Sequence, residues 1–324
     1  MASIDMPLEK LRKYKPILTG KKDFSLFWKN TINEARKYPV NPELKLVKDS
    51  PFKYMEAYDL TFAGFNGDKI KGWYLLPKFV KKEKLPVVVI YHGYSGGRGQ
   101  IADYSQWILL GCAVAVMDTR GQGGATGNML GYSNPSVGGW MTKGILDKNE
   151  YYYRAVYTDA VRILDFVFEQ PEIDKTCVAI TGGSQGGGIT IAAAGLDKRI
   201  TIAIPIIPFL CHFKRAVEIS PNGPYVEVAE YIKRYPHYID KVYDTLSYFD
   251  GMNFAANIKA RSLWSVTLWD DICPPSTVFA AYNNVKTKKE IRVYPYNKHE
   301  GIPWFDAEKF RVIAQCFKLK NNNH

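Results

Sequence analysis

The sequence contains little cysteine and little histidine. Its 324 residues include five of each, and no two cysteines form a CxxC pair. An odd cysteine count and scattered histidines do not match the spacing of structural or catalytic zinc ligands, so we expect no metal site. Cys112 and Cys177 lie in apolar runs and are expected to be small buried side chains. These features favour a cytoplasmic protein with free thiols.

Long apolar runs and low-complexity stretches are also absent. No run approaches the roughly 18 apolar residues of a membrane span, and the first 15 residues, MASIDMPLEKLRKYK, lack the apolar core of a signal peptide. No Gly/Ser-rich or Pro-rich linker and no fixed-period repeat divides the chain. With 46% hydrophobic and 23% charged residues, the composition is that of a globular protein. We therefore expect one domain over residues 1–324.

The formal net charge of +11 raises nucleic acid as a possible partner. The positive residues are scattered in small groups, such as those at 81–84 and 286–289, and no nucleic-acid-binding motif accompanies them. Such groups are typical of a solvated surface, so we expect neither a nucleic-acid nor a membrane partner.

The order of apolar patterns indicates an α/β fold. Short runs rich in β-branched residues, typical of strands buried on both faces, occur at 85–91, 112–117, 178–181, 200–207, 263–268 and 291–294. Helical patterns follow several of them, at 157–169, 185–196 and 306–319. This alternation predicts a mostly parallel central sheet with helices on both faces.

Three regions depart from that alternation. Residues 54–77 resemble a hairpin around a turn at 65–68, which predicts an antiparallel start and hence a mixed sheet. Residues 5–40 contain amphipathic helical pieces broken by proline, an N-terminal helical extension. Residues 209–254, rich in tyrosine and proline, form an insertion after the strand at 200–207. This insertion either covers the functional site or builds a subunit interface.

Gly182-Gly183-Ser184-Gln185-Gly186 matches the pattern G-x-S-x-G between a strand and a helix. That strand–turn–helix is the nucleophile elbow of α/β hydrolases, in which a tight turn lifts the serine to the top of the sheet. The alternative is a glycine-rich turn without chemistry that binds a phosphate, but no Walker lysine or GxGxxG spacing supports it. Ser184 is therefore the candidate nucleophile.

A serine hydroxyl needs a base, and in this fold the chain order is serine, then acid, then histidine. His299 follows the last expected strand and precedes the terminal helix, where that base belongs. The remaining histidines lie too early in the chain, inside the insertion or at its end: His92, His212, His237 and His324. We expect His92 only to cap its own loop.

The acid should follow the strand at 263–268, where Asp270 and Asp271 are adjacent. Two neighbouring aspartates cannot both face one imidazole. We favour Asp270 and keep Asp271 as the alternative; either could instead be a turn or helix-capping residue. The chosen carboxylate would orient His299 and fix its tautomer.

Two backbone N–H groups are expected to form an oxyanion hole. One belongs to Gln185, which follows the nucleophile at the start of a helix, and the second should come from the loop after an early strand. In the glycine-rich loop at 91–99 the amide of Tyr94 is the candidate. The alternative for this loop is a flexible turn without a role in catalysis.

Three ordered motifs give the chain a family resemblance. Arg120-Gly121-Gln122-Gly123-Gly124, the GxSQG segment at 182–186 and His299-Glu300 resemble the RGQ, GxSQG and HE motifs of carbohydrate esterase family seven. This family contains acetyl xylan esterases and cephalosporin C deacetylases. Further similar segments lie at 5–8, 93–94, 248–250 and 271–283, so the resemblance covers nearly the whole chain.

The resemblance implies roles for several residues. Ser184, Asp270 and His299 would be the catalytic triad, with Tyr94 and Gln185 supplying the oxyanion amides. Arg120 would brace loops near the site. A narrow acyl pocket would be lined by Tyr94, Phe209, Pro224 and Ile272.

The resemblance also implies an activity and an assembly. The substrates would be short acetylated xylo-oligosaccharides and small acetylated molecules such as cephalosporin C, hydrolysed without cofactor or metal. The assembly would be a homohexamer with active sites facing an internal cavity. The alternatives are another small-acyl carboxylesterase, a serine peptidase or a long-chain lipase of the same fold, and a catalytically inactive binding or assembly protein.

Overall fold

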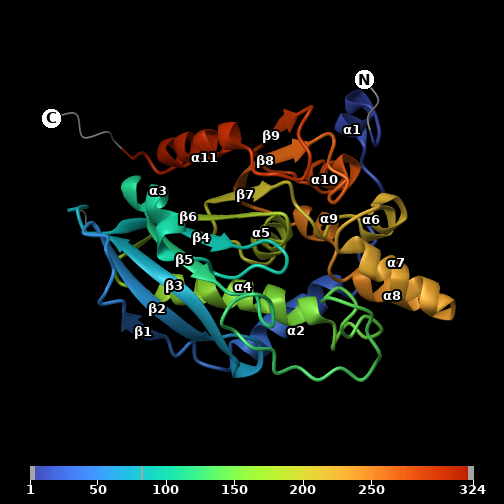
Figure 1. Cartoon of the computed structure of the whole chain (residues 1–324), viewed down its shortest axis with the longest axis horizontal. Helices are drawn as coiled ribbons and strands as arrows, with labels where there is room; N and C mark the ends of the chain where they lie inside the picture. Colours follow the sequence, from blue (N-terminus) through green and yellow to red (C-terminus); the bar gives the residue numbers. More distant parts are fainter. Residues whose placement is uncertain (1–3, 82, 320–324) are drawn as a thin grey trace.

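The computed structural model describes residues 4–81 and 83–319. Within these residues, nine strands form one sheet in the order β1-β2-β3-β5-β4-β6-β7-β8-β9 (Figure 1). Their bounds are β1 Glu43–Leu46, β2 Met55–Ala63, β3 Lys69–Pro77, β4 Leu85–Tyr91, β5 Ala113–Met117, β6 Ile173–Gly183, β7 Ile202–Ile206, β8 Arg261–Thr267 and β9 Lys289–Tyr294.

The sheet is mixed, as predicted. Six strands are mutually parallel: β5, β4, β6, β7, β8 and β9. The remaining pairs, β1 with β2, β2 with β3 and β3 with β5, are antiparallel. The hairpin predicted over 54–77 is β2 and β3. Its turn contains Asn66 at φ 57°, a left-handed conformation that asparagine tolerates better than most residues. The parallel strands all end at one edge, which therefore collects the loops that follow them.

Helices cover both faces of the sheet (Figure 1). Their bounds are α1 Leu8–Lys13, α2 Phe24–Ala35, α3 Ser105–Leu109, α4 Tyr152–Glu169, α5 Gln185–Leu196, α6 Phe213–Ile219, α7 Tyr225–Arg234, α8 Ile239–Leu246, α9 Gly251–Ala255, α10 Pro275–Tyr282 and α11 Pro303–Cys316. One face packs against α4, α5 and α10, with α2 and α9 outside them, and the other against α3 and α11. The α/β-hydrolase arrangement expected from the sequence is confirmed.

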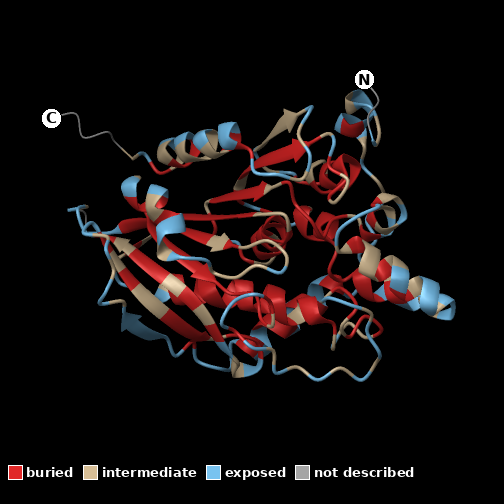
Figure 2. Ribbon diagram, in the orientation of Figure 1, coloured by how far each residue is buried: buried red, intermediate tan, exposed pale blue. Residues whose placement is uncertain are grey.

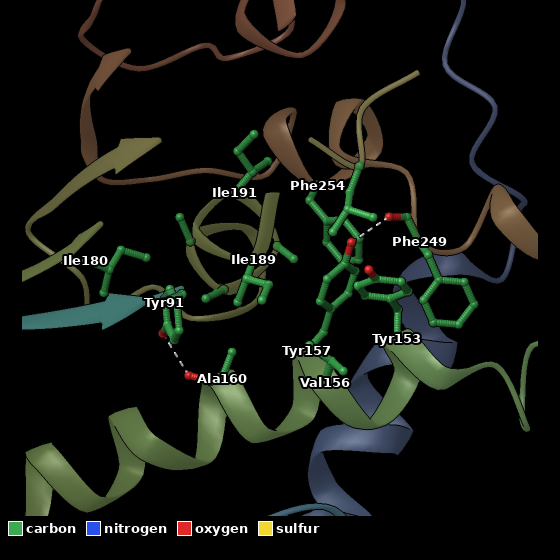
Figure 3. Close-up of a cluster of buried hydrophobic side chains, with 14 of the residues drawn as sticks. Tyr91, Tyr153, Val156, Tyr157, Ala160, Ile180, Ile189, Ile191, Phe249 and Phe254 are labelled. Atoms are coloured by element: carbon green, nitrogen blue, oxygen red, sulfur yellow. Dashed lines mark hydrogen bonds between the residues drawn. The ribbon is translucent and has the colours of Figure 1, made fainter. Parts of the chain in front are cut away.

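Each face has its own core, and strands β4, β5, β7 and β8 between them are mostly buried, whereas β1 is exposed and β9 is of intermediate burial (Figure 2). On the larger side, α4 lies along the sheet and its Ala160 carbonyl accepts a 2.9 Å hydrogen bond from the Tyr91 hydroxyl of β4 (Figure 3). Tyr157 of the same helix donates to the Phe249 carbonyl at 3.1 Å, which ties α4 to the insertion. These bonds satisfy phenol groups that burial would otherwise leave unpaired.

The insertion at 209–254 is helical, formed by α6, α7, α8 and the start of α9. It follows β7, and in Figure 1 α7 and α8 extend to one side of the sheet. In the described part of the chain, no helix is long and apolar enough to cross a membrane.

One burial prediction is wrong. Cys112 is buried, but Cys177 is only partly buried. The reason is a register shift in the pairing of β4 with β6, where Leu85 pairs Ile173 but Val87 already pairs Val178. The extra residues of β6 leave the regular ladder there, so a side chain within an apolar run reaches the surface.

Candidate active site

Ser184 lies on a strained turn between β6 and α5. Its φ of 55° and ψ of −117° place a non-glycine residue in a rarely occupied region of backbone conformation. The turn is held because the Ser184 N–H donates to the Ile206 carbonyl at 3.0 Å and its own carbonyl accepts from Phe209 N–H at 2.9 Å. Gly186 is required here because a Cβ at this position would lie 2.0 Å from the Tyr91 carbonyl oxygen. The sequence thus fixes the serine at the carboxyl edge of the sheet.

The structure brings Ser184, His299 and Asp270 together at that edge. The Nε2 atom of His299 lies 2.9 Å from Ser184 Oγ, and its Nδ1 atom lies 2.8 Å from Asp270 Oδ2. The three residues follow β6, β9 and β8 respectively, and these parallel strands end at the same edge, with β7 between β6 and β8. Asp270 is 1% exposed, so its carboxylate faces the imidazole in a medium of low dielectric. This is the hydrogen-bonded geometry of a serine nucleophile, a base and an orienting acid.

Backbone donors determine which oxygen of Asp270 faces the histidine. Its Oδ1 accepts from the N–H groups of Ile272 at 3.0 Å and Cys273 at 2.7 Å. Oδ2 remains for His299, with a further 3.2 Å bond from the Thr267 hydroxyl. The neighbouring Asp271 instead accepts from the side chain of Asn222, at the loop before α7. Of the two adjacent aspartates, only Asp270 is bonded to the imidazole.

The candidate oxyanion donors lie on either side of Gln122, a residue whose role sequence reasoning missed. The Gln122 side chain accepts from Ser95 N–H at 3.0 Å, in the loop that carries Tyr94. It also forms a reciprocal amide pair with Gln185, at 2.8 and 3.0 Å. Tyr153 of α4 donates to the same Gln185 oxygen at 2.9 Å. The only sequence signal for Gln122 is its place in the RGQ motif.

The first helix residue after the serine is Gln185, and it is fully buried. N–H groups in the first turn of a helix have no intrahelical acceptor and lie at the positive end of the helix dipole. The geometry of the turn therefore suits the binding of a negative oxygen beside Ser184.

Arg120 braces the sheet rather than the reacting groups. Its side chain is fully buried and forms a two-pronged ion pair with Asp159 of α4, at 2.7 and 2.8 Å. A third bond of 2.6 Å reaches Asp68 in the β2–β3 turn. Burial raises the pKa of Asp159, and the guanidinium opposes that rise. The arginine thus fixes the hairpin turn against α4.

Contacts between neighbouring segments link the four residues expected at the acyl pocket. The Tyr94 and Phe209 rings lie 6.2 Å apart and nearly perpendicular, and Phe209 follows the strand beside the elbow. Ile272 belongs to the segment that holds Asp270. Pro224 caps α7 next to Gly223, where an added Cβ would lie 2.7 Å from Ile272. These contacts place the four residues on segments adjoining those that carry Ser184 and Asp270.

His92 has a structural role in its loop. Its Nε2 accepts from Thr119 N–H at 2.7 Å while Nδ1 donates to the carbonyl of Gly93 at 2.8 Å. Burial lowers the pKa of this imidazole, which favours the neutral tautomer that the two bonds require. The histidine links the loop after β4 to the segment after β5.

Ligand-type atoms of Asp270, Cys273 and His299 lie within 4.8 Å of one another, and within the described residues they form the group best suited to hold a metal ion. Burial raises the pKa of the Cys273 thiol, so the sulfur is held in its protonated form. A metal ion there would have to displace that proton and break the bond between Asp270 and His299. The arrangement is better suited to the proton relay.

Comparisons with known proteins agree with this geometry. The sequence profile of the acetyl xylan esterase (AXE1) family matches residues 1–316. Acetyl esterase Axe7A from Xylanibacter ruminicola is 28% identical over 302 residues, which cover 88% of this chain and 65% of the relative. This chain therefore spans less than two thirds of that relative's length.

Two solved structures are similar over nearly their whole length. An acetyl xylan esterase from Paenibacillus sp. R4 has 48% identity and a TM-score of 0.93, covering 96% of this chain and 99% of that one. Acetyl xylan esterase 1 from Thermoanaerobacterium sp. JW/SL YS485 has 34% identity and a TM-score of 0.92, covering 97% and 99%. An acylaminoacyl peptidase from Pyrococcus horikoshii, 18% identical with a TM-score of 0.57, shares the fold. The chain belongs to the acetyl xylan esterase family of carboxylic ester hydrolases.

Proposed function

We propose that this protein is a serine esterase that removes acetyl groups from short acetylated xylo-oligosaccharides and from small acetylated molecules such as cephalosporin C. The relay of Ser184, His299 and Asp270 carries this proposal, because its distances of 2.9 and 2.8 Å suit proton transfer from the hydroxyl to the imidazole. The family supports the choice of acetylated sugars.

The proposed reaction has two halves. Ser184 Oγ attacks the acetyl carbonyl carbon while His299 Nε2 accepts the hydroxyl proton. The negative oxygen binds the amides of Gln185 and Tyr94, each of which contributes on the order of 10²–10³ in rate. His299 then gives its proton to the departing sugar oxygen, leaving an acetyl group on the serine. Water repeats the sequence and releases acetate.

The surroundings of the serine support a preference for small acyl groups. We propose that Tyr94, Phe209, Pro224 and Ile272 form the wall against which the acetyl methyl group packs. A wall of rings and a branched side chain would limit the length of the acyl chain, and one methylene in such a pocket changes selectivity by about 10–200-fold. A long-chain lipase would need a wider opening at this position.

A substrate panel tests the proposal. Hydrolysis of acetylated xylo-oligosaccharides, cephalosporin C, other acetylated sugars, p-nitrophenyl esters of increasing chain length and a peptide is compared between the wild type and Ser184→Ala. We expect acetyl esters to be preferred, and both hydrolysis and labelling by a fluorophosphonate to be lost in Ser184→Ala. Faster cleavage of the peptide or of long-chain esters would favour another serine hydrolase. Unchanged labelling of a folded Ser184→Ala variant would refute the assignment of the nucleophile.

We further propose a cytoplasmic homohexamer with its active sites facing an internal cavity. The resemblance to carbohydrate esterase family seven is the basis for the assembly, and the five cysteines, all free, support the location. Light scattering coupled to size-exclusion chromatography measures the assembly directly. A monomeric mass at micromolar concentration would contradict it.

A further inference from the structure

A carboxylate of the insertion contacts the side chain of Tyr94. Glu227, in the first turn of α7, accepts a 2.7 Å hydrogen bond from the Tyr94 hydroxyl on Oε1. Its other oxygen accepts from the Met141 N–H at 3.0 Å. The Tyr94 hydroxyl in turn accepts from the Trp140 N–H at 2.7 Å, and the two rings pack edge to face at 5.1 Å. One carboxylate therefore joins the loop after β4, the segment before α4 and the insertion.

The chain is shaped to admit this carboxylate. At Gly139 an added Cβ would lie 2.0 Å from Glu227 Oε1, and the residue has φ of +27°. A side chain at position 139 would therefore displace either the backbone or the carboxylate. The close approach allows the next two N–H groups of the chain to reach Glu227 and the tyrosine hydroxyl. This is an ordered contact rather than a surface carboxylate that happens to lie nearby.

The same turn of α7 carries part of the proposed acyl wall. Pro224 precedes the helix, and Tyr225 stacks on Phe209 with ring centroids 4.2 Å apart. Glu227 lies two residues after Tyr225 in this turn, so its bond to Tyr94 connects the insertion side of the pocket to the loop that carries the candidate oxyanion amide. The bond therefore joins the two sides, beside the packing of Phe209 against Tyr94 and Tyr225.

We propose that Glu227 is a positioning residue that sets both the width of the acyl pocket and the placement of the Tyr94 amide. This inference rests on the proposed function, because it assigns a consequence to the pocket and the oxyanion hole of the esterase. The insertion at 209–254 then acts as one wall of the active site. Small acyl groups are selected because the carboxylate holds that wall closed.

The substitution that tests this is Glu227→Gln. An amide keeps the shape of the side chain but has one oxygen where the carboxylate has two, so it cannot accept from both Tyr94 and Met141. Tyr94→Phe removes the other partner of the same bond and keeps the ring. Glu230→Gln is the matched control, because Glu230 lies on the same helix and its side chain is 50% exposed beside Lys233.

The decisive measurement is the ratio of kcat/KM for p-nitrophenyl butyrate to that for the acetate. A ratio within one preparation does not depend on the fraction of folded enzyme, so a merely structural defect leaves it unchanged. For Glu227→Gln and Tyr94→Phe we expect the ratio to rise about tenfold, as the pocket gains room for a longer chain. We also expect kcat/KM for the acetate to fall on the order of 10–100-fold through misplacement of the amide. Glu230→Gln should match the wild type in both.

The double variant completes the test. If Glu227 acts through the tyrosine hydroxyl, kcat/KM for the acetate falls little further in the double variant, Glu227→Gln with Tyr94→Phe, than in Glu227→Gln alone. Independent effects of the two substitutions on kcat/KM would instead multiply. An unchanged ratio in Glu227→Gln, or fully multiplicative losses, would overturn the inference. If Glu227→Gln does not fold, an unchanged ratio in Tyr94→Phe overturns it alone.

Ser184→Ala, assayed in parallel, separates this inference from the proposed function. Retained hydrolysis in that variant refutes the esterase mechanism. Lost hydrolysis in Ser184→Ala, together with wild-type ratios in Glu227→Gln and Tyr94→Phe, refutes only the role of Glu227.

Discussion

Replacing Asp270 with asparagine should inactivate the protein through the tautomer of His299. The backbone N–H groups of Ile272 and Cys273 both point at Oδ1, at 3.0 and 2.7 Å. In Asp270→Asn the amide oxygen must occupy that position, since an NH₂ group there would face two donors. The amide NH₂ is then directed at His299 Nδ1, which must become an acceptor. The remaining proton moves to Nε2, facing Ser184, and the histidine can no longer accept the serine proton.

The size of the effect follows from the loss of the base. A wrong tautomer of this kind costs about 10⁴ in kcat, which corresponds to about 5.5 kcal/mol of transition-state stabilisation. The fold should be retained, because the oxygen that binds the two backbone donors is preserved. The assay is steady-state hydrolysis of an acetyl ester, with circular dichroism and thermal unfolding as checks on the fold.

Asp271→Asn is the matched control. Asp271 bonds the side chain of Asn222 and not the imidazole, so its replacement should change kcat by less than about threefold, as expected for a surface substitution of roughly ±0.5 kcal/mol. If Asp270→Asn kept activity within tenfold of the wild type, or if Asp271→Asn were equally inactive, the assignment of the acid would be wrong.

Three further predictions concern the framework around the site. Arg120→Met leaves the fully buried Asp159 without its partner and should lower the free energy of unfolding by about 3–5 kcal/mol in urea titrations; a loss below about 1 kcal/mol would contradict the bracing role. Gly186→Ala places a Cβ 2.0 Å from the Tyr91 carbonyl and should cost about 1–3 kcal/mol and displace the serine, seen as a lower Tm and slower ester hydrolysis. Burial lowers the pKa of His212 to about 4, so between about pH 6.5 and 4 the unfolded chain binds a proton that the folded one does not, and stability falls on acidification. Acidification over that range should lower the free energy of unfolding of the wild type by about 1–2 kcal/mol more than that of His212→Asn, a modest difference because the ring is partly exposed. Denaturant titrations at several pH values measure this, and identical pH profiles of the two proteins would refute it.

Residues close together in the sequence were the most predictable part of the site. A serine between glycines, directly after a β-branched run, determines the elbow by itself, and the chain order then selects His299. The sequence favoured Asp270 over Asp271, and the structure supplies the physical difference, since the N–H groups of Ile272 and Cys273 bond the Asp270 carboxylate. Adjacent residues of one type offer no local signal for that difference.

Element bounds were less predictable where burial is extensive. The helical pattern at 157–169 missed the first turn of α4, which begins at Tyr152. Tyr152 and Tyr153 are both buried, so the helix has little polar contrast around its axis there and its periodicity disappears. Strand β1, Glu43–Leu46, was missed for a different reason: its residues are all exposed, so they show no alternation of burial.

Contacts between distant segments could not be predicted at all. Glu227 and Tyr94 are separated by 133 positions, and nothing in either local pattern indicates their bond. Gln122 was noticed only as part of a glycine-rich motif, and its pairing with Gln185 across 63 positions follows from the way β5 and β6 flank β4. Such pairs depend on the completed sheet, so a pattern confined to neighbouring residues does not contain them.

The order of the reacting groups along the chain has a consequence for biosynthesis. Ser184 emerges from the ribosome long before Asp270 and His299, which follow the last two strands of the sheet. The elbow itself also needs β7 and Phe209, because Ser184 bonds the Ile206 carbonyl and the Phe209 N–H. Without its base the serine hydroxyl is a weak nucleophile. A nascent chain therefore lacks the complete hydrogen-bonded relay until β8, β9 and the segments that follow them have been synthesised.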